Sequence, residues 1–140
     1  LVIATKATIA SNLYATKLQE KGFCNVKSLA TGLFVPFVEE GIYDGKPMQA
    51  LLEYYFSGYN PPDALILGCT HFPLIAHALS AYFGKDTILI HSGEAIVEYI
   101  QSTYHLPTQR PLHSLEFFAS DDVNALKHTA KAWLGNLYMP

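Results

Sequence analysis

The sequence has little charge, few cysteines and no long run of apolar residues. Only 15% of its 140 residues are charged, against roughly 25% in an average soluble domain, so we expect part of its surface to face a partner. Its nine Lys and Arg are scattered and its net charge is −3. No basic stripe is therefore present to bind phosphates, and nucleic acid is not an expected partner.

No apolar stretch reaches the roughly 18 residues that a membrane-spanning helix needs, and the first residues, LVIATKATIA, lack the basic region of a signal peptide. The two cysteines, Cys24 and Cys69, are too few for a disulfide framework and favour free thiols in a reducing compartment. We therefore expect a cytoplasmic protein with no membrane association. Because Leu1–Ala4 already has the pattern of a buried strand and no initiator Met precedes it, we also expect the chain to be part of a longer protein.

Short apolar stretches alternate with helix-period stretches along the whole chain. This alternation is typical of βα units and predicts an α/β fold with a largely parallel sheet and flanking helices. The predicted strands are Leu1–Ala4, Asn25–Ala30, Ala64–Gly68, Thr87–His91 and Leu115–Ala119.

Apolar residues at helical spacing predict the helices between these strands. The predicted helices are Ile9–Lys21, Phe34–Tyr43, Pro47–Phe56, one beginning at Pro73, one beginning near Gly93, and one after Asp122 that buries Leu126, Ala130, Trp133 and Leu134. Two segments rich in turn residues or prolines, Ser57–Asp63 and His105–His113, are predicted to be connecting loops.

The string Gly68-Cys69-Thr70-His71 follows a predicted buried strand and precedes a helix that begins near Pro73. In open α/β sheets, ligands bind at the edge of the sheet where the carboxyl ends of the strands lie. The N-terminal N–H groups of a helix there favour a carboxylate and stabilise a thiolate, and a histidine is a group that exchanges protons near neutral pH. Cys69 is accordingly a candidate reactive thiol, although a small buried side chain at a strand end is the common alternative for a free cysteine.

The motif GCTHFPL resembles the second-cysteine signature of glutamate racemases, which belong to the aspartate/glutamate racemase superfamily. VIATKATIASNLY, LFVPFVEEG and the FFASDD tail resemble further segments of that family, and HSGEAI does so with His91 in place of the usual Asp. The resemblance implies an amino-acid racemase that uses neither pyridoxal phosphate nor metal. It assigns Cys69 as the acid–base residue, with His71 as its proton partner and Glu39 as an auxiliary, and it places Thr5, Thr8, Thr70 and His71 around the substrate.

The family has two lobes, each with one catalytic cysteine. The resemblance implies that residues 1–91 form the second lobe and residues 92–140 a return segment of one strand and one helix, while the body of the first lobe is absent. It also implies glutamate as substrate and D-glutamate for peptidoglycan as product. Without the body of the first lobe, the tail would expose apolar faces, and such a patch favours a homo-oligomer.

Alternatives remain for the function and for several residues. An aspartate or hydantoin racemase of the same superfamily more often has Glu at the position of His71, and a non-catalytic α/β ligand-binding module would use the same motif only as a strand–helix junction. Glu40 competes with Glu39, and Thr5 and Thr8 are also suited to a turn and a helix cap. Cys24 is predicted to lie in the core. The histidines lack the spacing of a metal site, because His71 and His77 fall on different sides of a helix.

Overall fold

The computed structural model describes residues 1–104 and 116–134. The chain forms two compact units, Leu1–Val97 and Glu98–Pro140, and each is considered by itself. The predicted division after residue 91 remains a prediction, and the predicted loop His105–His113 lies outside the described residues.

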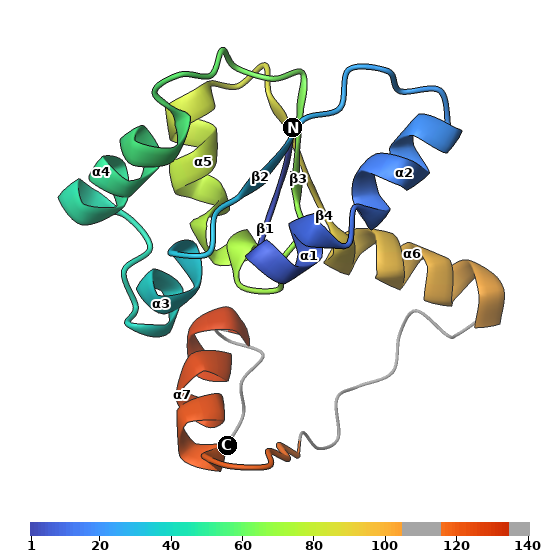
Figure 1. Ribbon diagram of the computed structural model, residues 1–140. Coiled ribbons are helices and arrows are strands. Elements are labelled where there is room, and N and C mark those ends of the chain that lie inside the picture. Colours follow the sequence, from blue (N-terminus) through green and yellow to red (C-terminus); the bar gives the residue numbers. More distant parts are fainter. Residues whose placement is uncertain (105–115, 135–140) are drawn as a thin grey trace. The chain divides into compact units, whose positions relative to one another are not determined.

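A sheet of four parallel strands forms the centre of the first unit (Figure 1). The strands are β1 (Val2–Ala4), β2 (Ser28–Ala30), β3 (Ala64–Leu67) and β4 (Ile88–His91). Their order is β2-β1-β3-β4, with Val2 paired to Ser28 and to Ile66, and Ile66 paired to Ile90. The predicted α/β class with a parallel sheet is confirmed, and these strands lie within four of the five predicted segments.

Helices connect the strands of the first unit, and one further helix belongs to the second unit. They are α1 (Lys6–Ala10), α2 (Leu13–Glu20), α3 (Phe34–Glu39), α4 (Gly45–Phe56), the short 3₁₀ helix η1 (Phe72–Ile75), α5 (Ala76–Phe83), α6 (Ser92–Tyr104) and, in the second unit, α7 (Val123–Leu134). In Figure 1, α4 and α5 lie on one side of the sheet and α2 on the other. This arrangement follows from parallel pairing, because every strand must be followed by a connection that returns over a face of the sheet.

The core of the first unit lies between the sheet and the helices α3, α4 and α5. In β3, Leu65 and Leu67 are buried while Ala64 and Ile66 are only partly covered, so one face of this strand is the better packed. Burial of apolar side chains in this core contributes about 25 cal/mol per Å² of apolar surface and is the main favourable contribution to folding. The largest fully buried side chains are Phe34, Phe56, Phe72, Ile3, Met48, Leu52, Leu65, Leu67, Ile75, Leu79, Val2 and Val38.

The single predicted helix over Ile9–Lys21 is wrong, because two helices, α1 and α2, occupy the region. Asn12 separates them with a positive φ of 56°, a left-handed conformation that Asn tolerates better than most residues. Ser11 strengthens the break, since its hydroxyl donates to Thr8 O at 2.7 Å and accepts from the Leu13 N–H at 3.4 Å. Such local bonds compete with helical hydrogen bonding.

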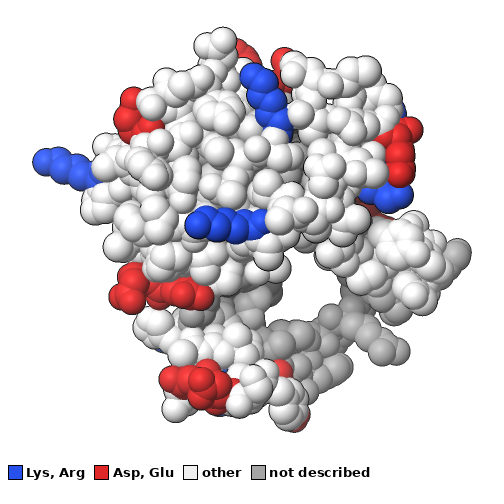
Figure 2. All heavy atoms as spheres, in the orientation of Figure 1, with Lys and Arg blue, Asp and Glu red and all other residues white. Residues whose placement is uncertain are grey.

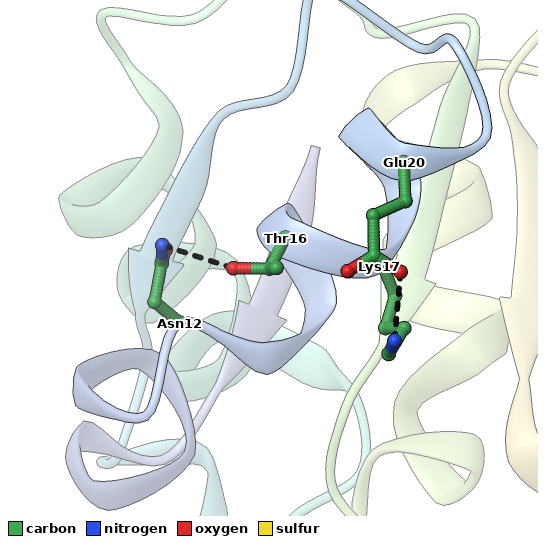
Figure 3. A network of polar contacts seen from close by, with 4 residues as sticks. All are labelled: Asn12, Thr16, Lys17 and Glu20. Carbon is green, nitrogen blue, oxygen red and sulfur yellow. Dashed lines mark hydrogen bonds and ion pairs between the residues drawn. The ribbon is translucent and has the colours of Figure 1, made fainter.

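Beyond the break, α2 is supported by polar contacts along its exposed surface (Figure 3). The Asn12 side-chain amide donates to the Thr16 hydroxyl at 3.4 Å, and Lys17 forms an ion pair with Glu20 at 2.7 Å. Both ion-pair partners are exposed, so the pair contributes only a few tenths of a kcal/mol.

Two predictions about the second unit are also wrong. Residues Glu116–Ala119 of the predicted strand Leu115–Ala119 have no regular secondary structure, and Leu115 lies outside the described residues. A strand exists only through pairing with a neighbour, and among the described residues the sheet is formed by β1 to β4. Leu126, predicted to be buried in the last helix, is 39% exposed. A helix buries its apolar stripe only where another element covers it.

Charged side chains on one face of the molecule can be seen in Figure 2. On the face shown in Figure 2, the Lys and Arg side chains lie apart from one another. Within residues 1–104 and 116–134, no helix has the length and apolar character needed to cross a membrane.

Candidate functional site

Residues that follow the parallel strands meet at one edge of the sheet, because all strand carboxyl ends point the same way. Thr5 follows β1, and Gly68 and Cys69 follow β3. Gly68 holds these two strand ends together, since its N–H donates to Ile3 O at 2.8 Å. A Cβ at Gly68 would lie 3.1 Å from both Ala4 Cβ and Ile3 O. The close approach of β1 and β3 therefore favours glycine at this position, because a larger residue would force its neighbours to shift.

Cys69, His71 and Glu39 form a chain of polar contacts at this edge. The Cys69 Sγ lies 3.7 Å from His71 Nδ1, and His71 Nε2 lies 3.3 Å from Glu39 Oε1. Glu39 is the last residue of α3, and His71 is the N-cap residue of η1. When the His71 proton is on Nε2, it lies on the side of the ring that is within ion-pair distance of the Glu39 carboxylate, and Nδ1 remains free to accept the proton of the thiol.

Solvent access differs along this chain of contacts. The side chains of His71 and Glu39 are 29% and 61% exposed, and Cys69 is partly buried. The thiol and the imidazole are therefore sheltered but reachable, whereas the carboxylate is largely in water. Glu40, the competing candidate, is exposed at the end of α3, and it is Glu39 that lies within ion-pair distance of His71.

The predicted substrate-binding threonines occupy two places. Thr5 and Thr8 lie together, with their hydroxyl oxygens 3.1 Å apart, and the Thr8 N–H donates to Thr5 Oγ1 at 3.4 Å. Thr5 is thus the N-cap residue of α1. Thr8, the threonine for which the sequence suggested a helix cap, lies within that helix instead. Thr70 is exposed in the turn between Cys69 and His71.

The chain is strongly similar to glutamate racemases. It is 54% identical to the glutamate racemase of Campylobacter jejuni over 137 residues, which is 98% of this chain and 55% of the relative, and 47% identical to that of Nitratiruptor over 99% of this chain and 54% of the relative. The crystal structure of the Campylobacter jejuni enzyme matches 99% of this chain and 55% of its own with a TM-score of 0.92 at 53% identity. That of the Francisella tularensis enzyme, in complex with D-glutamate, matches 95% of this chain and 52% of its own with a TM-score of 0.75 at 30% identity.

This chain is homologous to about half of a glutamate racemase. It spans about half the length of the curated relatives it matches. No protein-family model matches the sequence. The relationship therefore stands on individual relatives and on solved structures, and these agree.

Two cavities in the glutamate racemase homologue lie away from Cys69. One of about 530 Å³ is at the amino ends of β1 and β3, next to Leu1, Asp63 and Ala64, and one of about 400 Å³ lies between α4 and α5. Neither is lined by Cys69, His71 or Glu39. Cys69, His71 and Glu39 therefore lie at the carboxyl edge of the sheet and outside both of these cavities.

Cys24 differs from its prediction. Cys24 is exposed, and its thiol donates to Gly22 O at 3.6 Å. The cause is the later start of β2, at Ser28, which leaves Cys24 in the preceding loop. The prediction that Cys24 belongs to the core is wrong.

Another histidine lies at the carboxyl end of β4. His91 Nε2 is 3.4 Å from Glu94 Oε1, and its buried Nδ1 has no partner in the described part of the chain. The i, i+3 spacing of His91 and Glu94 in the sequence could have been used to predict this contact. Among the residues described here, no three His, Cys, Asp or Glu side chains are grouped so as to hold a metal ion.

Proposed function

We propose that this chain supplies one half of the active site of a glutamate racemase that interconverts L- and D-glutamate without a cofactor. The observation that carries the proposal is the contact chain from Cys69 through His71 to Glu39, in a chain homologous to glutamate racemases. A thiol within reach of an oriented imidazole is the arrangement that makes a cysteine a base.

Racemisation at an amino-acid Cα requires a base on one face and an acid on the other. In the proposed reaction, the Cys69 thiolate takes the Cα proton of one enantiomer and becomes a thiol, while an acid on the opposite face returns a proton to Cα. In the reverse direction, the Cys69 thiol gives its proton to Cα. His71 accepts and returns the thiol proton through Nδ1, and Glu39 keeps the other imidazole proton on Nε2.

The substrate is held by polar groups at the same edge. We assign Thr5, Thr8 and Thr70 to hydrogen bonds with the carboxylates and ammonium of glutamate. We place His71 next to the substrate, beside the Cys69 thiol. The supporting observation is their position after β1 and β3, where parallel sheets bind ligands.

The other face of the substrate belongs to a second lobe in this proposal. The relatives are nearly twice as long as the matched region, and the candidate residues here lie outside both described cavities. A first lobe that carries the other catalytic cysteine would close the site and exclude water, which strengthens contacts to carboxylates. The proposed setting is a cytoplasmic homo-oligomer whose D-glutamate enters peptidoglycan.

The test combines this chain with the portion of the Campylobacter jejuni glutamate racemase that it does not match. D-Glutamate in D₂O is followed by circular dichroism and by loss of the Cα proton signal in NMR spectra. We expect no turnover by the 140-residue chain alone and turnover when the complementary portion is added, with Cys69→Ser as the inactive control. Equal activity of the Cys69→Ser mixture would refute the proposal. Turnover of aspartate in place of glutamate would favour the related aspartate racemase, and no turnover of either would favour a ligand-binding module.

A further inference from the structure

A tyrosine on α4 anchors the start of the helix that carries Glu39. The Tyr55 hydroxyl accepts a hydrogen bond from the backbone N–H of Leu33 at 3.1 Å. Leu33 is the N-cap residue of α3, and Tyr55 lies in the last turn of α4. N–H groups at a helix start have no partner within the helix. The Tyr55 hydroxyl therefore satisfies one of them and joins the two helices.

Aromatic packing extends this anchor to the residue next to His71. The fully buried Phe34 ring lies 5.1 Å from the Tyr55 ring and 5.6 Å from the Phe72 ring, the latter at an interplanar angle of 85°. Edge-to-face pairs of this kind are favourable and directional. Because Phe34 begins α3 and Phe72 follows His71, this packing sets where α3 lies relative to η1.

Glu39 depends on that placement. It is the last residue of a helix of only six residues, and its side chain is 61% exposed. An ion pair this exposed contributes little by itself, since water competes for both groups. The 3.3 Å contact of Glu39 with His71 is therefore a consequence of how α3 is held and cannot hold the helix in place.

We propose that Tyr55 is a positioning residue that keeps Glu39 in contact with His71 and thereby supports proton transfer at Cys69. The importance of Tyr55 for catalysis rests on the proposed function, whereas the contacts that Tyr55 makes are independent of that function. Loss of the hydroxyl releases the start of α3, Glu39 moves from His71 Nε2, and the imidazole tautomer that leaves Nδ1 facing the thiol is no longer favoured.

The test measures thiol reactivity in the 140-residue chain and needs no racemase activity. Iodoacetamide alkylation at Cys69 is followed by mass spectrometry, with the exposed Cys24 as an internal reference. We expect Tyr55→Phe, which removes only the hydroxyl and keeps the ring on Phe34, to lower the Cys69 to Cys24 rate ratio about twofold to fivefold, the effect of losing one ordinary hydrogen bond.

Controls separate positioning from general loosening of the fold. Tyr54→Phe removes the hydroxyl of the neighbouring tyrosine, whose side chain is 72% exposed, and should leave the ratio unchanged. Glu39→Gln should lower the ratio at least as far as Tyr55→Phe, and the double variant should match Glu39→Gln alone, because Tyr55 acts through Glu39.

Leu33→Pro tests the same bond from the donor side. Its φ of −68° suits proline, which has no N–H to donate, so it should reproduce the effect of Tyr55→Phe and replaces that variant if the latter fails to fold. An unchanged ratio in folded Tyr55→Phe or Leu33→Pro overturns the inference. An unchanged ratio in Glu39→Gln, or a further loss in the double variant, overturns it as well. Intact coupling in a chain that never supports racemisation would instead refute the proposed function.

Discussion

The Glu39 carboxylate Oε1 lies 3.3 Å from Nε2 of His71, although the two residues belong to different helical segments. On the other side of the same ring, Nδ1 lies 3.7 Å from Cys69 Sγ. The imidazole therefore lies between an acceptor and a proton donor, and this relationship supports the predictions that follow.

The first prediction concerns His71→Ala in the 140-residue chain. Because Nδ1 is the base next to Cys69, we expect alkylation of Cys69 to slow on the order of tenfold, below the roughly 10²–10⁴-fold that positioned acid–base groups supply in catalysis. Mass spectrometry of each site gives the rates. Cys24, which lies in an exposed loop, should react as before, and an unchanged rate at Cys69 would contradict a role for His71.

The second prediction concerns Cys69→Ser in the mixture with the complementary racemase portion. Serine keeps a similar shape but has a far less acidic group, so racemisation should fall by at least roughly 10²–10⁴-fold in both directions. Glutamate binding, measured by calorimetry, should persist. Cys24→Ser serves as the matched control and should retain activity, and a Cys69→Ser mixture that keeps near-native turnover would count against the mechanism.

The third prediction concerns the packing that holds α3 and η1 together. Phe72 is fully buried and contacts Phe34, so Phe72→Ala should lower the free energy of unfolding by about 3–5 kcal/mol through loss of burial and an unfilled cavity. Urea unfolding followed by circular dichroism measures the change. Phe23→Ala, at an exposed phenylalanine, should change stability by less than about 0.5 kcal/mol.

The fourth prediction concerns the 140-residue chain made as an isolated piece, in which Leu1 has a free amino group that donates to Ala64 O at 2.8 Å. Burial lowers the pKa of this amino group below its ordinary value of 8.0, with nearby Lys27 lowering it further and Asp63 opposing the change. The unfolded chain then binds more protons than the folded chain just below pH 8.0. Stability should therefore rise with pH through that window and level off above it.

Urea unfolding at about pH 6 and about pH 9 measures this contribution. The control is the same chain with an acetylated amino terminus, which cannot titrate there but retains an N–H for Ala64 O. The rise in stability should be larger in the free chain than in the acetylated one. The same rise in both chains would show that other groups cause it.

Much of the fold was predictable because the pattern is local. Short apolar stretches such as Ala64–Leu67, followed by helical periodicity, indicate parallel βα units wherever they occur. The parallel direction of the strands then brings Thr5 and Cys69 to one edge without further information. The GCTH motif could be placed at this edge for the same reason, since its residues are adjacent in the chain, whereas its chemical role was an expectation from the resemblance to glutamate racemases.

The sequence by itself determined the α/β class, the parallel strands and the place of Cys69 at a strand end, since these depend on periodicity and on neighbouring residues. Only the tertiary structure decided between Glu39 and Glu40 for the contact with His71, since that contact depends on how α3 packs through Phe34 against Phe72. The tertiary structure also decided the break at Asn12 and the lack of regular structure at Glu116–Ala119. A left-handed residue and an unpaired segment depend on competing hydrogen bonds and on distant partners, which local periodicity does not record.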